Sequence, residues 1–249
     1  MLLEIDVDGH RSGIRPDGAE LLPAAAALAD GAELVGVLTH AGDSYECKTT
    51  AEIEAAAEAE RAGIVLAAER LRAAGHTVKI VSAGSTPTLM FAKDETGVTE
   101  MRAGVCALFD LFMSNVGACT VDDIAGSVLA TVIGRQVDKR RVILDCGFLA
   151  LSRDRGTARQ AHDYGYGLVC GLDGKPLADG TIVLTGTNQE HGILTLPENS
   201  PLTQEDFPIG RRLRILPNHA CPTAAPYGSL VLIENGRVAE VLDHVRGWD

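Results

Sequence analysis

Positive charge is scarce in this chain of 249 residues, which has 22 lysines and arginines against 34 aspartates and glutamates, a net charge of −12. This balance argues against nucleic acid as a partner, because phosphate-backbone binding depends on clustered Lys and Arg. No apolar run approaches the ~18 residues of a membrane helix, and the N-terminus MLLEIDVDGH has no basic n-region. We therefore expect no nucleic-acid partner, no membrane partner and a cytoplasmic location.

Paired cysteines are also missing. The six cysteines are scattered without any CxxC motif, and 46% of the residues are hydrophobic. A chain of this size can bury a real core without disulfide staples. We expect reduced cysteines and either one large domain or two ordinary ones.

The first 115 residues alternate strand-like and helix-like segments. The longest predicted helix, 50–74, has a capping box at Thr49 and Glu52 and a terminating Gly75. The other predicted elements are a helix at 21–29 and strands at 2–8, 33–40, 77–84 and 104–111. Strict alternation predicts parallel strands joined by crossovers. Four such steps are half of a TIM-type β/α barrel, so we expect a partial barrel over 1–115 and a missing N-terminal portion.

From residue 116 to 249 the pattern becomes β-rich, without long amphipathic helices. The predicted β segments are 128–137, 140–152, 166–172, 180–196, 211–217 and 228–245. Glu234, Asn235 and Gly236 place a hairpin turn in the last of them. The expected fold class is α/β plus β, a half barrel followed by a mostly antiparallel β domain.

The segment LPNHACPTAAP places His219 and Cys221 two residues apart between prolines. The prolines favour an extended backbone, in which residues i and i+2 project to the same side. Imidazole and thiolate are ligands that zinc accepts, and two protein ligands would leave positions open. The alternative interpretation is a buried cysteine beside a hydrogen-bonded histidine.

Seven short motifs occur in one order along the chain, most of them near the ends of predicted strands. They are DVDGHRSG (6–13), THAGDSY (39–45), SAGSTPT (82–88), TEMRAG (99–104), DCGFLALSRDRG (145–156), QEHG (189–192) and LPNHACP (216–222). Together they resemble the D-serine dehydratase and D-threonine aldolase family, a group of alanine-racemase-like pyridoxal phosphate (PLP) enzymes. The resemblance covers essentially the whole chain and implies a homodimer acting on a small D-amino acid.

The resemblance also implies roles for individual residues. Arg11 would reach a cofactor or substrate carboxylate, and His40 would pack on the cofactor ring or move protons. Arg102 would lie near that ring. The remaining candidate cofactor-binding residues are Tyr45, Gly84, Ser85, Thr86, Gly104 and Val105. Each of these roles has an alternative. SAGSTPT could be a plain turn, Arg11 could form a surface ion pair, and His40 could be a structural histidine.

In this family the PNHxC arrangement resembles an open zinc site, with His219 and Cys221 as ligands. The metal would assist loss of the substrate β-hydroxyl as a Lewis acid, after a lysine removes the α-proton. The aldolase branch tends to carry Asp in place of Cys and a harder metal such as Mn²⁺. The expected activity is therefore a D-serine dehydratase-like lyase, with a D-threonine aldolase as the alternative.

The family holds PLP on a lysine near its N-terminus, and no lysine here lies in a matching motif. The five lysines are Lys48, Lys79, Lys93, Lys139 and Lys175. This absence agrees with the expected half barrel. It also leaves open a protein of another class, a non-catalytic remnant that binds metal.

Overall fold

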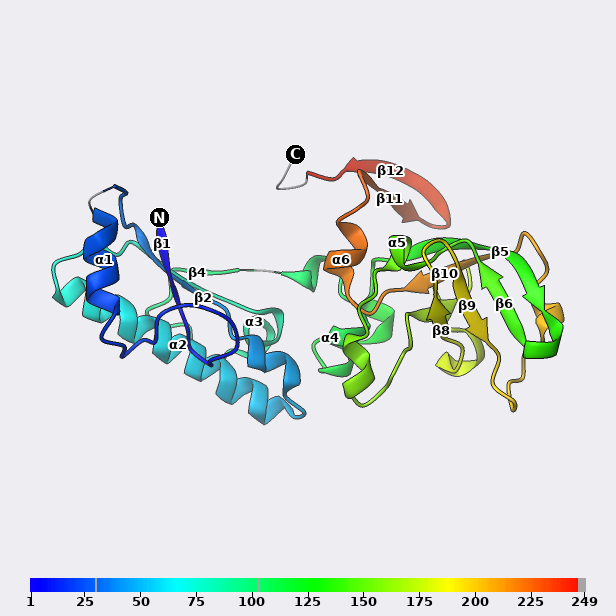
Figure 1. Cartoon of the computed structure of the whole chain (residues 1–249), viewed down its shortest axis with the longest axis horizontal. Helices are drawn as coiled ribbons and strands as arrows, with labels where there is room; N and C mark the ends of the chain where they lie inside the picture. The colour runs from blue at the N-terminus through cyan, green and yellow to red at the C-terminus, as the bar shows by residue number, and fades with distance from the viewer. Residues whose placement is uncertain (30, 103, 246–249) are drawn as a thin grey trace. The chain divides into compact units, whose positions relative to one another are not determined.

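The computed structural model describes residues 1–29, 31–102 and 104–245. The chain divides into two compact units, and each is described by itself (Figure 1). The first comprises Met1–Ala107 and Val116–Ala118, and the second comprises Leu108–Asn115 and Cys119–Asp249. In the part of the chain that is described, no helix is both long and apolar enough to cross a membrane.

The first unit is a four-stranded parallel sheet in the order β1-β2-β3-β4. Its elements are β1 (Leu2–Ile5), α1 (Leu21–Ala29), β2 (Gly36–Thr39), η1 (Gly42–Glu46), α2 (Thr50–Ala73), β3 (Ile80–Ala83), α3 (Thr86–Phe91), β4 (Glu100–Met101) and η2 (Val105–Ala107). Within the described residues, β1 and β4 each pair with one strand only. The sheet is therefore a barrel portion with two open edges.

Helix α2 forms where its sequence signals predict. Thr49 and Glu52 make both hydrogen bonds of the capping box, and Gly75 follows the helix at φ +90°, which a residue without Cβ tolerates. One face of α2 buries Ile64 and Leu71 against Val37 and Val81 of the sheet. This packing holds the helix over the parallel strands (Figure 1).

The second unit is a six-stranded antiparallel sheet in the order β7-β10-β5-β6-β9-β8, with a separate two-stranded sheet. The strands are β5 (Val128–Gln136), β6 (Arg141–Leu144), β7 (Leu168–Cys170), β8 (Leu184–Thr187), β9 (Gly192–Thr195), β10 (Arg212–Leu216), β11 (Ser229–Glu234) and β12 (Arg237–Asp243). The helices are α4 (Leu111–Asn115), α5 (Phe148–Leu151) and α6 (Ala220–Ala224), with short 3-10 turns η3 to η7 between strands. The main core is built around Val132, Leu144, Phe207 and Leu213.

The hairpin, the parallel sheet of the first unit and the antiparallel sheet of the second agree with the sequence expectation. Three local predictions are wrong. No strand covers 104–111: β4 ends at Met101, and 105–107 is a 3-10 turn. Segment 140–152 is strand β6 followed by helix α5 rather than one β segment. The third error concerns LPNHACP, which is not extended throughout.

Helix α6 begins directly after His219, so Cys221 and Pro222 lie in its first turn. Proline is tolerated there because the first N–H groups of a helix have no partner within it. His219 itself keeps the extended conformation, with φ −140° and ψ 113°. The two prolines thus flank the start of a helix rather than an extended segment.

Residues 108–115 belong to the second compact unit, whereas 116–118 belong to the first. The reason is a set of contacts made by α4. The N–H groups of Leu111 and Phe112 donate to the carbonyls of Pro217 and Asn218, at 3.1 Å each. Asp110 also accepts from the N–H of Ala220 at 2.8 Å.

Candidate functional site

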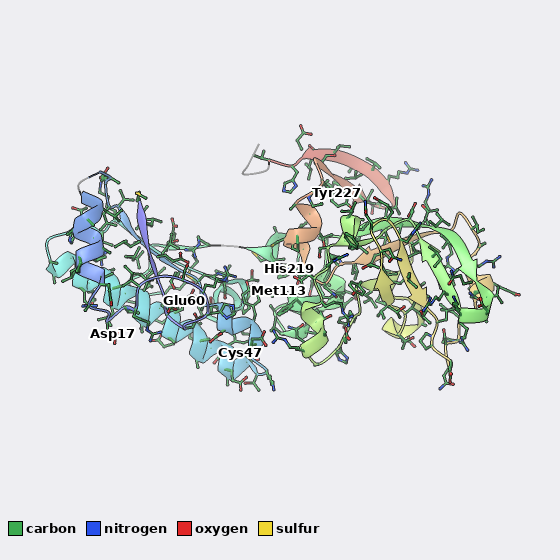
Figure 2. The ribbon with its side chains drawn as sticks, in the orientation of Figure 1. Asp17, Cys47, Glu60, Met113, His219 and Tyr227 are labelled. Atoms are coloured by element: carbon green, nitrogen blue, oxygen red, sulfur yellow. The ribbon has the colours of Figure 1, made fainter. Side chains whose placement is uncertain are left out.

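The candidate cofactor residues of the first unit lie on segments that follow the carboxyl ends of β1, β2, β3 and β4. Glu60, in the middle of α2 and 1% exposed, links two of these loops (Figure 2). Its Oε1 accepts from the N–H of Ala41 at 3.0 Å and of Gly84 at 3.2 Å. Its Oε2 accepts from the hydroxyl of Thr88 at 2.6 Å. Sequence reasoning missed Glu60, because nothing in a helical pattern singles out one glutamate among several.

The segment SAGST (82–86) contains a buried hydroxyl that has no hydrogen-bond partner among the described residues. It is Oγ1 of Thr86, a residue that is 1% exposed. A Cβ built on Gly104 would come within 3.2 Å of that oxygen. Ser85 differs, because its hydroxyl caps α3 with Thr88 and contacts the hydroxyl of Ser44 at 2.8 Å.

Gly84 is at φ +136°, and a Cβ there would lie 2.8 Å from backbone atoms of Arg102. The backbone after β3 therefore lies so close to the backbone after β4 that a side chain at position 84 would not fit. A phosphate oxygen would satisfy the orphaned Thr86 hydroxyl, and the glycines at 84 and 104 leave backbone within reach. These residues fit the phosphate end of PLP.

His40 lies between the two loops. Its Nδ1 is 3.0 Å from the carbonyl of Gly84, its ring stacks on Tyr45 with centroids 5.9 Å apart, and its Nε2 is buried without a partner among the described residues. Burial lowers the pKa of His40; the Gly84 hydrogen bond opposes this, and the nearby charge of Arg11 adds to the lowering. A neutral imidazole with one open nitrogen can accept or donate a proton.

Arg11 is exposed on the loop after β1, whereas the guanidinium of Arg102 is engaged. Arg102 donates to the carbonyl of Ser82 at 3.0 Å, to its hydroxyl at 2.6 Å, and to the carbonyl of Thr39. It thus ties β2 to β3 at their carboxyl ends. Val105 is buried and Gly104 is exposed beside it.

In the second unit, Cys221 lies close enough to His219 to raise the pKa of that histidine. His219 also reaches Asp154, with Nδ1 2.7 Å from Oδ2. Burial alone would lower the pKa of His219, but the hydrogen bonds to Asp154 and Cys221 outweigh it and raise that pKa to about 10. The hydrogen bond to His219 in turn lowers the pKa of Asp154, against the effect of burial.

The segment before α6 is fixed from both sides. Asn218, 3% exposed, donates to the carbonyls of Asp154 at 3.0 Å and Gly165 at 2.7 Å, and accepts from the hydroxyl of Thr157 at 3.2 Å. Asp110, fully buried, caps the start of both α4 and α6. No local pattern points to these partners, which are 53 to 110 positions away along the chain. Figure 2 shows His219 at the start of α6.

No cluster of three or more His, Cys, Asp or Glu side chains that could hold a metal occurs within the described ranges. The imidazole of His219 and the thiol of Cys221 are donors of the kind that zinc accepts, but they are fewer than the three protein ligands of a usual open zinc site. His191, which also follows a β segment, is exposed in the turn between β8 and β9.

The lysines do not fit covalent attachment of PLP. All five side chains are exposed, and two of them pair with carboxylates: Lys93 with Glu54 at 3.0 Å and Lys175 with Asp122 at 2.9 Å. A lysine that forms a Schiff base is normally desolvated or placed next to another cation. None of the five lysines has such surroundings in the described structure.

Comparison with known proteins assigns both units. Residues 1–111 match the family described as "Alanine racemase, N-terminal domain", and residues 125–233 match the one described as "Putative serine dehydratase domain". The chain is 52% identical over 250 residues to D-threo-3-hydroxyaspartate dehydratase of Delftia sp. (strain HT23), covering 99% of this chain and 65% of the relative. It is 29% identical to D-serine dehydratase of Dictyostelium discoideum, covering 94% and 61%.

Solved structures agree. The Delftia enzyme, in a structure of a cysteine-to-alanine variant "in the metal-free form", superposes with a TM-score of 0.91 at 52% identity, covering 99% of this chain and 66% of that one. D-threonine aldolase from Filomicrobium marinum shares the fold, with a TM-score of 0.75 at 21% identity over 97% and 62%.

The protein thus has the alanine racemase-like fold, a barrel portion followed by an antiparallel sheet domain. Within that fold, residues 125–233 match the putative serine dehydratase domain, and over nearly its whole length the chain is similar to dehydratases of D-amino acids. The chain spans about two thirds of the length of the curated relatives it matches, 65% and 61%.

Proposed function

We propose that this chain provides the phosphate loop and the metal ligands of a PLP- and zinc-dependent dehydratase acting on 3-hydroxy-D-amino acids. The placement of His219 and Cys221 at the start of α6 carries the proposal, since it brings a nitrogen and a sulfur donor that zinc accepts into one helix start. The 52% identity to a D-threo-3-hydroxyaspartate dehydratase supports that substrate over D-serine, whose dehydratase is 29% identical.

The residues would divide the work as follows. Thr86, with the backbone at Gly84 and Gly104, would hold the phosphate, and His40 with Tyr45 would lie near the cofactor ring. Arg11 would bind a carboxylate through its planar fork of donors. His219 and Cys221 would hold zinc. When bound, PLP supplies an electron sink for the α-carbon and zinc a Lewis acid for the leaving hydroxyl.

Zinc content tests the metal pair. His219→Ala and Cys221→Ala are expected to lose bound zinc after dialysis, measured by mass spectrometry of the metal. His191→Ala and Cys119→Ala, the matched controls from the same unit, are expected to retain it. Unchanged zinc in the first two variants would remove the metal site from the proposal.

Product analysis separates the two enzyme classes. A dehydratase converts a 3-hydroxy-D-amino acid into ammonia and a keto acid, whereas an aldolase yields glycine and an aldehyde. Cys221 favours the dehydratase and zinc, since a carboxylate at that position would suit Mn²⁺ better. Formation of glycine and an aldehyde without ammonia would favour the aldolase.

The non-catalytic alternative rests on the lysines, none of which is placed for a Schiff base. In that case the chain would bind zinc without turning over substrate.

The homodimer implied by the resemblance is likewise a proposal, which light scattering of the purified chain tests.

A further inference from the structure

We propose that Asp154 is a positioning residue of the metal site, one that holds the Nδ1 edge of His219 so that Nε2 is presented to the metal. The inference rests on the proposed function, because it takes His219 as a metal ligand. It assigns a role to the loop between α5 and η5 (Gly156–Arg159).

The first observation is the contact itself. Asp154 Oδ2 lies 2.7 Å from His219 Nδ1, and both side chains are partly buried, 33% and 41% exposed. A carboxylate only accepts hydrogen bonds, so Nδ1 carries the proton that they share. When His219 gives up its other ring proton, the lone pair available to a metal is then on Nε2, on the other side of the ring.

The second observation is that Asp154 is itself held in place. Its Oδ1 accepts from the N–H of Gly156 at 2.7 Å, and its N–H donates to the hydroxyl of Ser152 at 3.1 Å. Its carbonyl accepts from Asn218, the residue before His219, at 3.0 Å. Two hydrogen bonds thus join Asp154 to consecutive residues of the ligand segment.

The third observation is backbone strain at the turn that delivers Asp154. Ser152 ends α5 at φ +72° and ψ 170°, a region that favours glycine and that folded proteins use where the surroundings demand it. Gly156 is equally constrained, since a Cβ there would meet the ring of Phe112 at 2.6 Å. The loop adopts a costly conformation whose outcome is the carboxylate at His219.

Replacing Asp154 with asparagine tests this role, because the two side chains have the same shape. Asparagine has one acceptor oxygen where Asp154 uses two, one for Gly156 and one for His219. If the oxygen stays with Gly156, the amide NH₂ faces Nδ1 and favours the tautomer that protonates Nε2. If the oxygen turns to His219, the NH₂ opposes the N–H of Gly156 and the loop shifts.

The experiment measures zinc affinity of the full chain by competition with a chelating dye. Loss of a carboxylate behind a metal-bound histidine typically weakens binding about 10–100-fold, so we expect that change for Asp154→Asn. Asp163→Asn is the matched control: Asp163 also accepts from a backbone N–H, that of Gly165, and pairs with Arg155 at 2.7 Å. It is expected to bind zinc like the wild type.

Two further measurements separate positioning from general structural support. The visible spectrum of the Co²⁺-substituted protein is expected to change in Asp154→Asn and not in Asp163→Asn, because it reports ligand geometry. Asp154→Glu, which keeps a carboxylate, is expected to recover part of the affinity even if Asp154→Asn folds poorly by circular dichroism.

Equal zinc affinity and equal Co²⁺ spectra in Asp154→Asn and Asp163→Asn would overturn the inference. If His219→Ala and Cys221→Ala still abolish zinc binding in that case, the proposed function stands without it. If those two variants keep their zinc, the proposed metal site fails and the inference fails with it.

Discussion

At the scale of single residues, Glu60 is a buried carboxylate that organises two loops. It accepts hydrogen bonds from the N–H groups of Ala41 and Gly84 and from the hydroxyl of Thr88. The same Gly84 contacts His40 through its carbonyl. Glu60 thereby connects α2 to both candidate cofactor loops of the first unit.

Replacing Glu60 with alanine should destabilise the protein. Two buried N–H groups would lose their acceptor, and unsatisfied donors of this kind cost roughly 2–4 kcal/mol together. Urea denaturation measures the loss in the free energy of unfolding. Glu69→Ala, an exposed glutamate on the same helix, is expected to change stability by less than about 0.5 kcal/mol. Equal losses in the two variants would contradict the assigned role.

His40 makes the stability depend on pH. Burial lowers its pKa in the folded state below the ordinary value of 6.5, so the unfolded chain binds the proton more readily. The contribution of neutral His40 is fully present above about pH 6.5 and is lost as pH falls through the folded-state pKa. Relative to His40→Asn, the wild type should lose stability below about pH 6.5. A constant difference between the two proteins down to about pH 5 would disprove this.

At the scale of elements, helix α2 was predictable because its signals are local. Both hydrogen bonds of its capping box are present, 3.2 Å from the N–H of Glu52 to Thr49 Oγ1 and 3.1 Å from the N–H of Thr49 to Glu52 Oε2. The helix ends at Ala73, within one residue of the predicted end.

Thr49→Ala removes the cap of α2 and should cost about 1 kcal/mol of unfolding free energy. Chemical denaturation followed by circular dichroism measures the change. Thr50→Ala, at the neighbouring exposed position in the first turn, is the control and should have little effect. A comparable loss in the control would show that the cap contributes nothing of its own.

Helix α6 shows where local signals fail. Pro217 and Pro222 favour an extended segment, yet the carboxylate of Asp110 accepts from the N–H of Ala220 and starts a helix there. His219 and Cys221 therefore lie at a helix start rather than on the extended segment that the prolines predicted. Asp110 lies 110 positions away, beyond any local pattern.

At the scale of the whole molecule, the lysines bear on activity most directly. All five are exposed, so none has the desolvated surroundings that make a lysine a good Schiff-base former. After incubation with PLP and borohydride reduction, mass spectrometry is expected to find scattered, substoichiometric adducts. One lysine modified to completion would contradict this and would argue against the non-catalytic alternative.

Most of the element succession, the parallel and antiparallel halves and the hairpin turn at Asn235 and Gly236 were readable from the residues. Each depends on neighbours within a few positions, through hydrophobic periodicity, capping or turn chemistry. The open-edged four-stranded sheet and the match to alanine racemase-like proteins confirm the half barrel.

The supporting contacts could not be read in this way. Glu60 meets its loops from 19 to 28 positions away, and Asp154 meets His219 across 65 positions. Such partners are chosen by packing of the whole unit, which brings together side chains that no local spacing relates. Short-range chemistry therefore specified the elements and the candidate ligands, whereas long-range packing selected the carboxylates that hold them.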